Sequence, residues 1–236
     1  MPDIVSAVCG ALCGAGAVMA YGVRGRSSTM FGPSVYRGPA SRQALAITFD
    51  DGPSESTPDL LRVLADHGVA ATFFQCGANV ERLPEVARAV VGHGHEVGNH
   101  SQTHPKFYFR TPAFIRDELT RAQEIIEQTT GVSATLFRAP FGVRWPGMRD
   151  AQRQIGLLGV MWTVIGRDWV LDTPAIVRRV LPRVANGAII CLHDGRELDP
   201  QPDVESTIEA VRRLIPMLKA QGYHFKTVSQ LICPTN

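Results

Sequence analysis

Two short polar segments of this chain, TFDDGP at residues 48–53 and HSQTH at residues 100–104, carry side chains that could together bind a metal ion and activate water. The first segment supplies two adjacent aspartates, and the second supplies two histidines four residues apart. Two neutral imidazoles and one carboxylate bind zinc, cobalt, nickel or iron and leave positions open for water and substrate. The pattern therefore predicts a catalytic metal site in which one aspartate binds the metal and the other takes a proton.

The aspartates and the histidines can reach one site only in particular backbone geometries. Adjacent residues of a regular strand point to opposite faces, so Asp50 and Asp51 can share a site only where the strand breaks into a turn, which the following Gly-Pro favours. His100 and His104 would share one face of a helical turn, so we expect an ordered loop with one turn of helix there. Taken singly, each segment is explained by a polar turn or a surface histidine pair. The combination favours the metal site.

Three further polar clusters, which begin at Arg138, Asp168 and His193, each follow an apolar run. Hydrolysis needs a base, a means of holding the oxyanion and a proton for the departing nitrogen. We expect Asp50 to be the base, Arg138 to pair with that carboxylate, and His193 to be the acid. Asp168 near His193 would favour the protonated imidazole. Each cluster alone is also explained by a surface salt bridge, a loop turn or a strand terminus.

Composition and charge exclude several classes of protein. A chain of 236 residues with 44% hydrophobic content is long enough to form one sizeable α/β domain. A net charge of +2 without clustered cations argues against nucleic acid and favours a small or neutral polymer as the partner. The cysteines are odd in number and show no Cys-x-x-Cys spacing, which indicates neither a disulfide framework nor a structural zinc site. They are Cys9, Cys13, Cys76, Cys191 and Cys233.

Residues 1–26 form an apolar N-terminal segment that we interpret as a membrane anchor. Residues 4–23 carry no charge, and about 20 apolar residues suffice to span a bilayer. A cleaved signal peptide fits less well, because Asp3 and no Lys or Arg precede the apolar run. Arg24 and Arg26 would lie in the cytoplasm by the positive-inside rule, which conflicts with an external polymer and leaves the orientation open. We expect a membrane-associated or cell-envelope protein, with a cytoplasmic location and a tail docked on the domain as alternatives.

Residues 27–43 predict a connector, and residues 44–236 predict one folded domain in which strand-like and helical patterns alternate. The expected strands are residues 44–49, 69–74, 95–98, 135–137, 159–164 and 188–192, and the expected helices are residues 57–67, 84–91, 112–130, 148–155, 174–184 and 204–220. This alternation predicts an α/β fold with a parallel sheet that is closed or nearly closed into a barrel. Every polar cluster then falls at the carboxyl end of a strand, where the catalytic groups of such folds gather.

Five motifs occur in order between about residues 44 and 231, namely TFDDGP, HSxTH, RxPFG, DW and LHD. They resemble the motifs of the NodB-homology polysaccharide deacetylases, carbohydrate esterase family four. The resemblance implies a single catalytic domain folded as a distorted (β/α)7 barrel. It also implies metal-dependent removal of N-acetyl groups from an amino-sugar polymer or oligomer, of the chitin oligosaccharide or peptidoglycan type. The cofactor would be one divalent metal ion, most often zinc, with cobalt or nickel as alternatives.

The same resemblance implies roles for individual residues. The metal ligands would be Asp51, His100 and His104. Asp50 would be the base, oriented by Arg138. His193 would be the acid, tuned by Asp168. The substrate-binding residues would be Phe141, through its backbone N–H to the oxyanion, Trp169 in the acetyl pocket, and Cys191 and Leu192 beside it.

Two positions depart from the family pattern. Phe141 stands where Tyr is usual, and Cys191 stands where an apolar residue, often Leu, helps to shape the acyl pocket. An altered acyl pocket leaves a deformylase of a lipid-linked amino sugar as the nearest alternative. A two-histidine, one-carboxylate iron oxygenase is less favoured, because it would not need Asp50 and His193. A non-catalytic carbohydrate-binding module is also less favoured, because no expected polar catalytic position is replaced.

Overall fold

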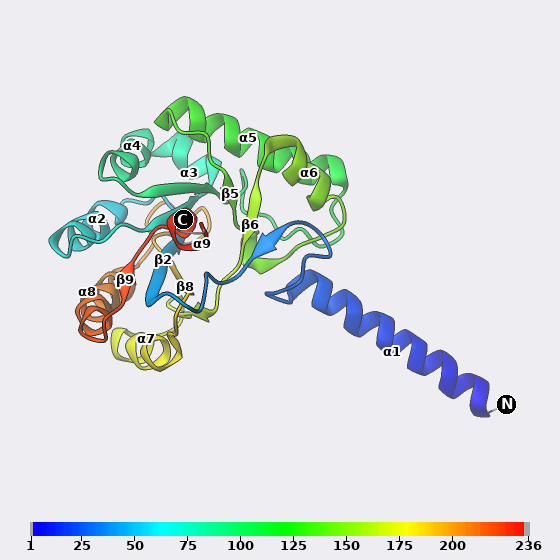
Figure 1. Cartoon of the computed structure of the whole chain (residues 1–236). Coiled ribbons are helices and arrows are strands. Elements are labelled where there is room, and N and C mark those ends of the chain that lie inside the picture. Colours follow the sequence, from blue (N-terminus) through cyan, green and yellow to red (C-terminus); the bar gives the residue numbers. More distant parts are fainter. Residues whose placement is uncertain (1, 234–236) are drawn as a thin grey trace.

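The computed structural model describes residues 2–233, except for the side chains of residues 2–5, 7 and 8 (Figure 1). The strands are β1 (Ser34–Val35), β2 (Ala44–Asp50), β3 (Thr72–Gln75), β4 (Glu96–Asn99), β5 (Leu136–Phe137), β6 (Leu158–Val160), β7 (Val164–Ile165), β8 (Ala188–His193) and β9 (His224–Phe225). The helices are α1 (Pro2–Arg24), α2 (Thr57–Asp66), α3 (Gly77–Arg82), α4 (Pro84–Gly92), α5 (Pro112–Thr130), α6 (Met148–Ile155), α7 (Thr173–Val180), α8 (Glu205–Ala220) and α9 (Val228–Ile232). Two 3₁₀ turns, η1 (Pro140–Gly142) and η2 (Leu181–Arg183), complete the order.

The strands that the structure describes form one parallel sheet, in the order β1-β6-β5-β4-β3-β2-β8-β7, with β9 beside β2. The single strand expected at residues 159–164 is divided into β6 and β7, because its first part pairs with β5 and its second part with β8. One short stretch of chain therefore joins β7, at one end of the sheet, to β6, which lies next to the end strand β1 on the other side. The sheet curls inside helices α2 to α8 (Figure 1). The expected α/β fold, a distorted (β/α) barrel, is confirmed.

Strand β2 lies near the centre of the sheet, and all of its residues are buried. Successive side chains of a strand point to opposite faces. Phe49 therefore packs outward into the core between the sheet and the helices, together with Leu192 of β8. Thr48 and Asp50 point the other way, into the barrel interior. A polar interior at the carboxyl end of β2 follows from this alternation.

Helix α5 begins and ends where its sequence provides capping groups. Oγ1 of Thr111 accepts a hydrogen bond from the Phe114 backbone N–H at 3.2 Å, and Gly131 ends the helix with a left-handed backbone (φ 72°). The elements that the sequence analysis did not predict are β1, β9, α3 and α9. Each has only two to six residues, too few to show a clear hydrophobic period.

Helix α1 extends away from the barrel, but its C-terminal end is packed against it (Figure 1). Val23 is buried in a core cluster, and its carbonyl oxygen accepts a hydrogen bond from the Arg144 backbone N–H at 3.1 Å. The buried Arg144 guanidinium donates to the carbonyl oxygens of Gly25 and Ser28. Farther along, β1 pairs with β6. Part of the segment expected as a connector therefore adds a strand to the sheet.

Among the residues whose side chains the structure describes, no helix is both long enough and apolar enough to cross a bilayer. Membrane contact through residues 4–23 stays a prediction. So does the division of the chain at residues 1–26, 27–43 and 44–236.

Replacing Arg144 with alanine should loosen the junction between α1 and the barrel, because the change removes both side-chain contacts to the backbone of Gly25 and Ser28. We expect faster amide hydrogen exchange across residues 22–30 and unchanged exchange in β2 and β8. The matched control is Arg153→Ala on the exposed side of α6, which should leave both regions unchanged. Slow exchange across residues 22–30 in the Arg144→Ala protein would contradict this role.

Candidate active site with a metal centre

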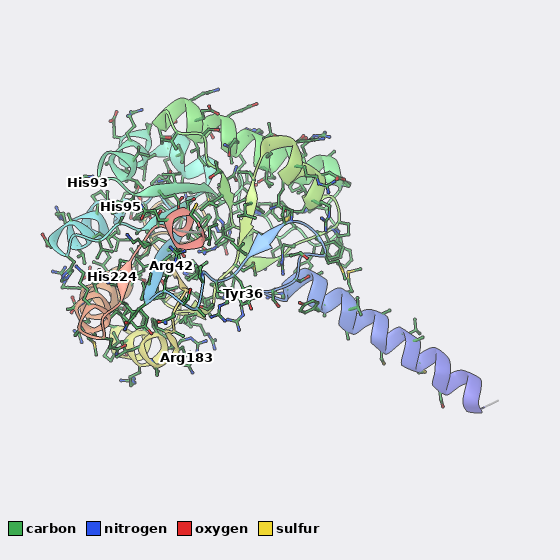
Figure 2. All side chains as sticks on the ribbon, viewed as in Figure 1. Tyr36, Arg42, His93, His95, Arg183 and His224 are labelled. Atoms are coloured by element: carbon green, nitrogen blue, oxygen red, sulfur yellow. The ribbon has the colours of Figure 1, made fainter. Side chains whose placement is uncertain are left out.

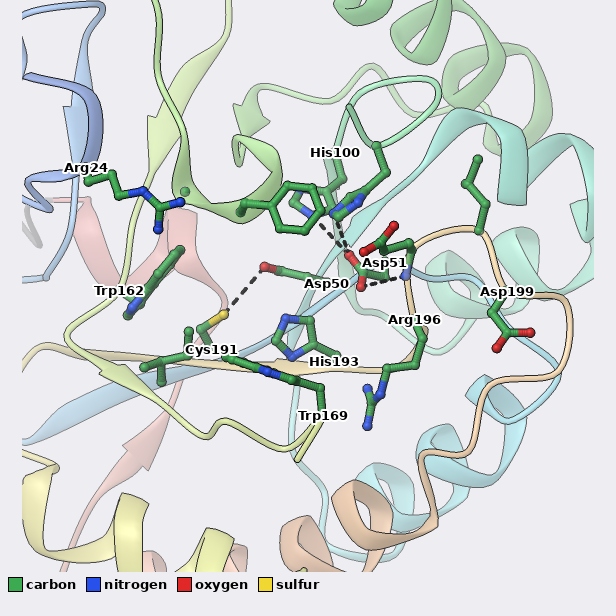
Figure 3. Close-up of a pocket in the computed structure, with 16 residues that line it drawn as sticks. Arg24, Asp50, Asp51, His100, Trp162, Trp169, Cys191, His193, Arg196 and Asp199 are labelled. Atoms are coloured by element: carbon green, nitrogen blue, oxygen red, sulfur yellow. Dashed lines mark hydrogen bonds and ion pairs between the residues drawn. The ribbon is translucent and has the colours of Figure 1, made fainter. Parts of the chain in front are cut away.

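The polar clusters meet in one pocket at the carboxyl ends of the parallel strands (Figure 3). Strand ends β2, β4, β5, β7 and β8 each contribute to it or to the layer beneath it. The cavity has a volume of about 790 Å³, which lies within the usual range for small-molecule sites. Five segments far apart in the sequence are thereby brought to one place.

Asp51 and the two histidines form a compact set of metal donors. Oδ1 of Asp51 lies 3.3 Å from Nε2 of His100 and 3.0 Å from Nε2 of His104. One donor atom from each of the three residues lies within 4.8 Å of the others, and all three side chains are buried. The structure thus brings together the three ligands that the family resemblance implies.

The hydrogen bond of His100 tests whether these residues fit a metal ion. Nδ1 of His100 lies 2.7 Å from the carbonyl oxygen of Arg138, so that nitrogen carries a proton, and in the neutral imidazole Nε2 turns a lone pair toward Asp51. Oδ1 of Asp51 is buried and accepts no hydrogen bond within residues 2–233. Lone pairs that face each other in a buried site repel unless a cation lies between them. The residues therefore fit one divalent ion.

The loop that carries the histidines is not helical, so the expected turn of helix is wrong. Ser101 and His104 have left-handed backbones, with φ of 66° and 53°. Oδ1 of Asn99 accepts from the Ser101 backbone N–H at 2.8 Å, and Oγ of Ser101 accepts from the His104 backbone N–H at 3.2 Å. These side-chain bonds stabilise a tight loop in place of a helix. The loop still turns both imidazoles toward Asp51.

Asp51 is held in place by two elements that the sequence analysis did not assign. Asp51 itself has a left-handed backbone (φ 74°), which directs its side chain out of the line of β2. The Glu197 backbone N–H donates to Oδ2 of Asp51 at 2.9 Å. Nδ2 of Asn79, in α3, donates to the carbonyl oxygens of Asp51 and Glu197 at 2.7 and 2.9 Å. The spacing of these residues in the sequence gives no sign of this support.

Asp50 has a different environment, dominated by a fully buried arginine. Arg138 donates through one guanidinium nitrogen to Oδ1 of Asp50 at 2.7 Å and to Oγ1 of Thr48 at 2.6 Å. Its other nitrogens donate to the carbonyl oxygens of Val160 and Met161, at 3.2 and 3.4 Å. The pairing expected between Arg138 and Asp50 is thus present. It leaves Oδ2 of Asp50 free of the guanidinium, on the pocket side, where the Cys191 thiol donates to it at 3.5 Å.

His193 and Asp168 form a second charged pair on the other wall of the pocket. Oδ1 of Asp168 lies 2.9 Å from Nδ1 of His193, and its Oδ2 accepts from the His193 backbone N–H and from Oγ1 of Thr207, both at 2.8 Å. Burial alone would lower the pKa of His193, but the Asp168 carboxylate outweighs it and raises that pKa to about 9. His193 is therefore protonated at neutral pH, with Nε2 left for the pocket.

Among the residues expected to bind substrate, the structure separates Leu192 from the others. Phe141, Trp169 and Cys191 line the pocket, and residues Phe141 and Trp169 are 37% and 45% exposed. Leu192 is fully buried on the opposite face of β8, where it packs in the core beneath the helices. Because side chains alternate along a strand, Cys191 and Leu192 cannot both face the cavity.

Several pocket residues carry no role in the sequence analysis. They are Arg24, Trp162, Ile165, Arg196, Glu197, Leu198 and Asp199. The last four come from the loop that follows the LHD motif. Because loops at the carboxyl ends of parallel strands line the site, their position directly after β8 could have predicted that they line the pocket. Trp162 lies at the break between β6 and β7 and so faces the cavity. Arg24 reaches the pocket from the end of α1, outside the expected domain, and no local pattern marks it.

The other histidines labelled in Figure 2 lie at the opposite end of the barrel. His93 and His95 precede β4, and His224 begins β9, so all three are at amino ends of strands. Nδ1 of His95 accepts a hydrogen bond from the Ala71 backbone N–H at 3.2 Å, and burial lowers the His95 pKa to about 4. His95 is thus a neutral structural residue.

Comparisons with known proteins agree with this geometry. Residues 37–160 match the polysaccharide deacetylase family. The chain is 36% identical over 198 residues to a chitooligosaccharide deacetylase of Bradyrhizobium sp. (strain ANU 289), an alignment that covers 80% of this chain and 90% of that protein.

Solved structures give the same result. A peptidoglycan N-acetylglucosamine deacetylase superposes with a TM-score of 0.79 at 29% identity, covering 84% of this chain and 92% of that one. A pseudoenzyme of carbohydrate esterase family four from Bacillus anthracis superposes with a TM-score of 0.77 at 30% identity, covering 86% of this chain and 70% of that one. This chain therefore belongs to the polysaccharide deacetylase family, the NodB-homology group of carbohydrate esterase family four, and is a hydrolase of that family.

Proposed function

We propose that this protein removes N-acetyl groups from amino-sugar polymers or oligomers, of the chitin oligosaccharide or peptidoglycan type. One observation carries the proposal: beside the three donors of the metal centre, Asp50 keeps a separate carboxylate oxygen directed into the pocket. A site that only bound metal would not need this second carboxylate. The relatives named above as chitooligosaccharide and peptidoglycan deacetylases support this substrate class.

Asp51, His100 and His104 would hold one divalent ion, with zinc expected and cobalt or nickel as alternatives. When bound, such an ion lowers the pKa of water and polarises an acyl oxygen. The chain itself supplies the proton transfers and the orientation of the substrate.

Asp50 would accept the proton of the attacking water. The Arg138 guanidinium fixes Oδ1 of Asp50 and neutralises the buried charge, so Oδ2 is the oxygen left to take that proton. The backbone N–H of Phe141, at the left-handed turn after β5, would hold the acyl oxygen as negative charge develops on it.

His193 would donate the proton that the departing amine needs. Asp168 orients the imidazole through Nδ1, so the proton for transfer is the one on Nε2. Because Asp168 keeps His193 protonated while Arg138 pairs with Asp50, the base and the acid occupy separate environments in one pocket.

The pocket walls suit a sugar chain. Trp162, Trp169 and Phe141 present partly exposed rings on which apolar faces of sugars can pack. Cys191 would border the acyl group. One similar structure is a pseudoenzyme, so the proposal depends on the side chains of this chain: Asp50 and His193 lie in the same pocket as the three proposed metal donors.

We also propose a cell-envelope location, with membrane contact through residues 4–23, because peptidoglycan is an envelope polymer and one similar structure is named for acting on it.

The direct experiment measures acetate and formate released from N-acetylglucosamine oligomers, peptidoglycan fragments and acetylated xylan, with and without a chelator. We expect acetate from the amino-sugar substrates, loss of activity with chelator, and recovery with added zinc, cobalt or nickel. Formate in place of acetate would favour the deformylase, and no release from any substrate would favour a binding module. Turnover without oxygen would exclude the oxygenase.

The two aspartates should be separable by mutation. Asp50→Asn should keep the metal but lose turnover by on the order of 10²–10⁴-fold, because only the proton acceptor is removed. His104→Ala should lose metal affinity itself, since it removes one of three donors. Metal content by mass spectrometry and acetate release check both variants, and near-normal turnover of Asp50→Asn would refute its role as the base.

Replacing Asp168 with asparagine should move the alkaline limb of the pH profile. The Asp168 carboxylate raises the His193 pKa to about 9, so the wild-type value of kcat/KM should fall as pH rises through that range. Without the negative charge the imidazolium is less favoured, and the limb should shift to lower pH by about one unit or more. An unchanged alkaline limb would show that another group supplies the proton.

Arg24 should contribute to substrate binding from outside the matched family region. Its side chain lines the pocket and is held by the Tyr108 hydroxyl at 2.6 Å from Nε. Arg24→Gln should raise KM by roughly 3–10-fold and leave kcat nearly unchanged, because it removes hydrogen bonds remote from the reacting atoms. Arg153→Gln on α6 is the control and should change neither constant. An equal loss in kcat for Arg24→Gln would contradict a binding role.

A further inference from the structure

A second group of metal donors lies in the same pocket, beside the first. Asp50, Cys191 and His193 each offer one donor atom, and these atoms lie within 4.8 Å of one another. The pairing of β2 with β8 places them side by side, because Thr48 is in register with Cys191 and Asp50 is in register with His193. In Figure 3 the Cys191 sulfur is directed toward the Asp50 carboxylate.

Each of the three residues keeps one atom available for a ligand. Arg138 occupies Oδ1 of Asp50, which leaves Oδ2. Within residues 2–233 the only hydrogen-bond partner of Oδ2 is the Cys191 thiol, which donates to it at 3.5 Å and would exchange its proton for the metal. Asp168 occupies Nδ1 of His193, which leaves Nε2. The available atoms are therefore one carboxylate oxygen, one sulfur and one imidazole nitrogen.

The sulfur distinguishes this group from the donors around Asp51. Thiolates select soft or borderline ions, whereas a set of two imidazoles and a carboxylate accepts many divalent ions. We propose that Asp50, Cys191 and His193 form a second site, for a thiophilic divalent cation such as Cd²⁺ or Zn²⁺ in excess, and that its occupation inhibits the hydrolase. Only the inhibition rests on the proposed function; the site rests on the three donors.

Binding at this site is an exchange of protons for metal and involves no redox change. The S–H bond of Cys191 breaks, a metal–sulfur bond forms, and the proton goes to solvent. His193 likewise releases the Nε2 proton and offers that lone pair. The ion then occupies the proposed base and the proposed acid together, so neither can transfer a proton.

The second site should fill after the first. The Arg138 guanidinium lies against Asp50 and repels an approaching cation, whereas a cation between Asp51 and His100 removes a repulsion between lone pairs. Binding at the second site must also displace two protons. One equivalent of metal should thus support activity, and further thiophilic metal should remove it.

The test uses the full-length protein with Cys9, Cys13 and Cys233, all exposed, replaced by serine, so that only the buried Cys76 and Cys191 remain. The protein is loaded with one equivalent of Zn²⁺ and then titrated with Cd²⁺, and the ultraviolet charge-transfer band of a cadmium–thiolate bond is recorded together with acetate release. We expect the band to grow with Cd²⁺ and the activity to fall with the same midpoint.

Two variants assign the sulfur. Cys191→Ser and Cys191→Leu should both abolish the band and raise the inhibitory Cd²⁺ concentration by on the order of 10–100-fold. Cys76→Ser is the matched buried control and should keep both effects. A band that persists in the Cys191 variants, or no band in the parent protein, would overturn the site. Inhibition that stays unchanged while the band is lost would overturn its inhibitory role.

The cadmium–thiolate band is recorded without substrate, so it tests the second metal site independently of the proposed deacetylase function. A parent protein that shows the band but releases no acetate from any substrate would retain the second site and refute the proposed function.

Discussion

The charge balance around the buried Asp51 carboxylate is the constraint on which the rest of the site depends. One of its oxygens faces two imidazole nitrogens at 3.0 and 3.3 Å, and the tautomer of His100 is fixed by a backbone carbonyl. A buried carboxylate that faces neutral imidazole nitrogens is stabilised when a cation lies between them. The strained backbones of Asp51, Ser101 and His104 converge on that point, and structures keep such conformations where function requires them.

The neighbouring Asp50 shows how one residue step separates two chemical roles. It follows the regular alternation of β2 into the barrel interior and meets Arg138, which is fully buried and bound to two strands and a threonine. Asp51 leaves the strand at a left-handed turn and joins the histidines. The ion pair keeps the Asp50 charge compensated without metal, so this carboxylate stays available to solvent or substrate in the pocket.

The sequence predicted the structure best where the position of a residue depends only on the strand or helix that carries it. Alternating strands and helices predicted the parallel barrel. The rule that polar groups gather at strand ends correctly placed Asp50 and His193 in one cavity, with Arg138 paired to Asp50 beneath it. The sequence predicted the structure least well where a residue is placed by contacts between segments far apart in the chain or by side-chain hydrogen bonds within a loop. No local pattern reveals that Arg24 approaches from α1, and the helical spacing of the two histidines is overridden by side-chain bonds within their loop. Leu192 was misplaced because adjacent strand residues cannot share a face.

The two donor groups of the pocket differ in one atom type, and this difference gives the most direct test of the metal centre. X-ray absorption spectroscopy of the full-length protein with one equivalent of zinc reports the elements bound to the ion. We expect nitrogen and oxygen neighbours from His100, His104 and Asp51, with the scattering pattern of two imidazoles and no sulfur. A sulfur neighbour, or fewer than two imidazoles, would place the first ion elsewhere and contradict the assignment of His100, His104 and Asp51 as its ligands.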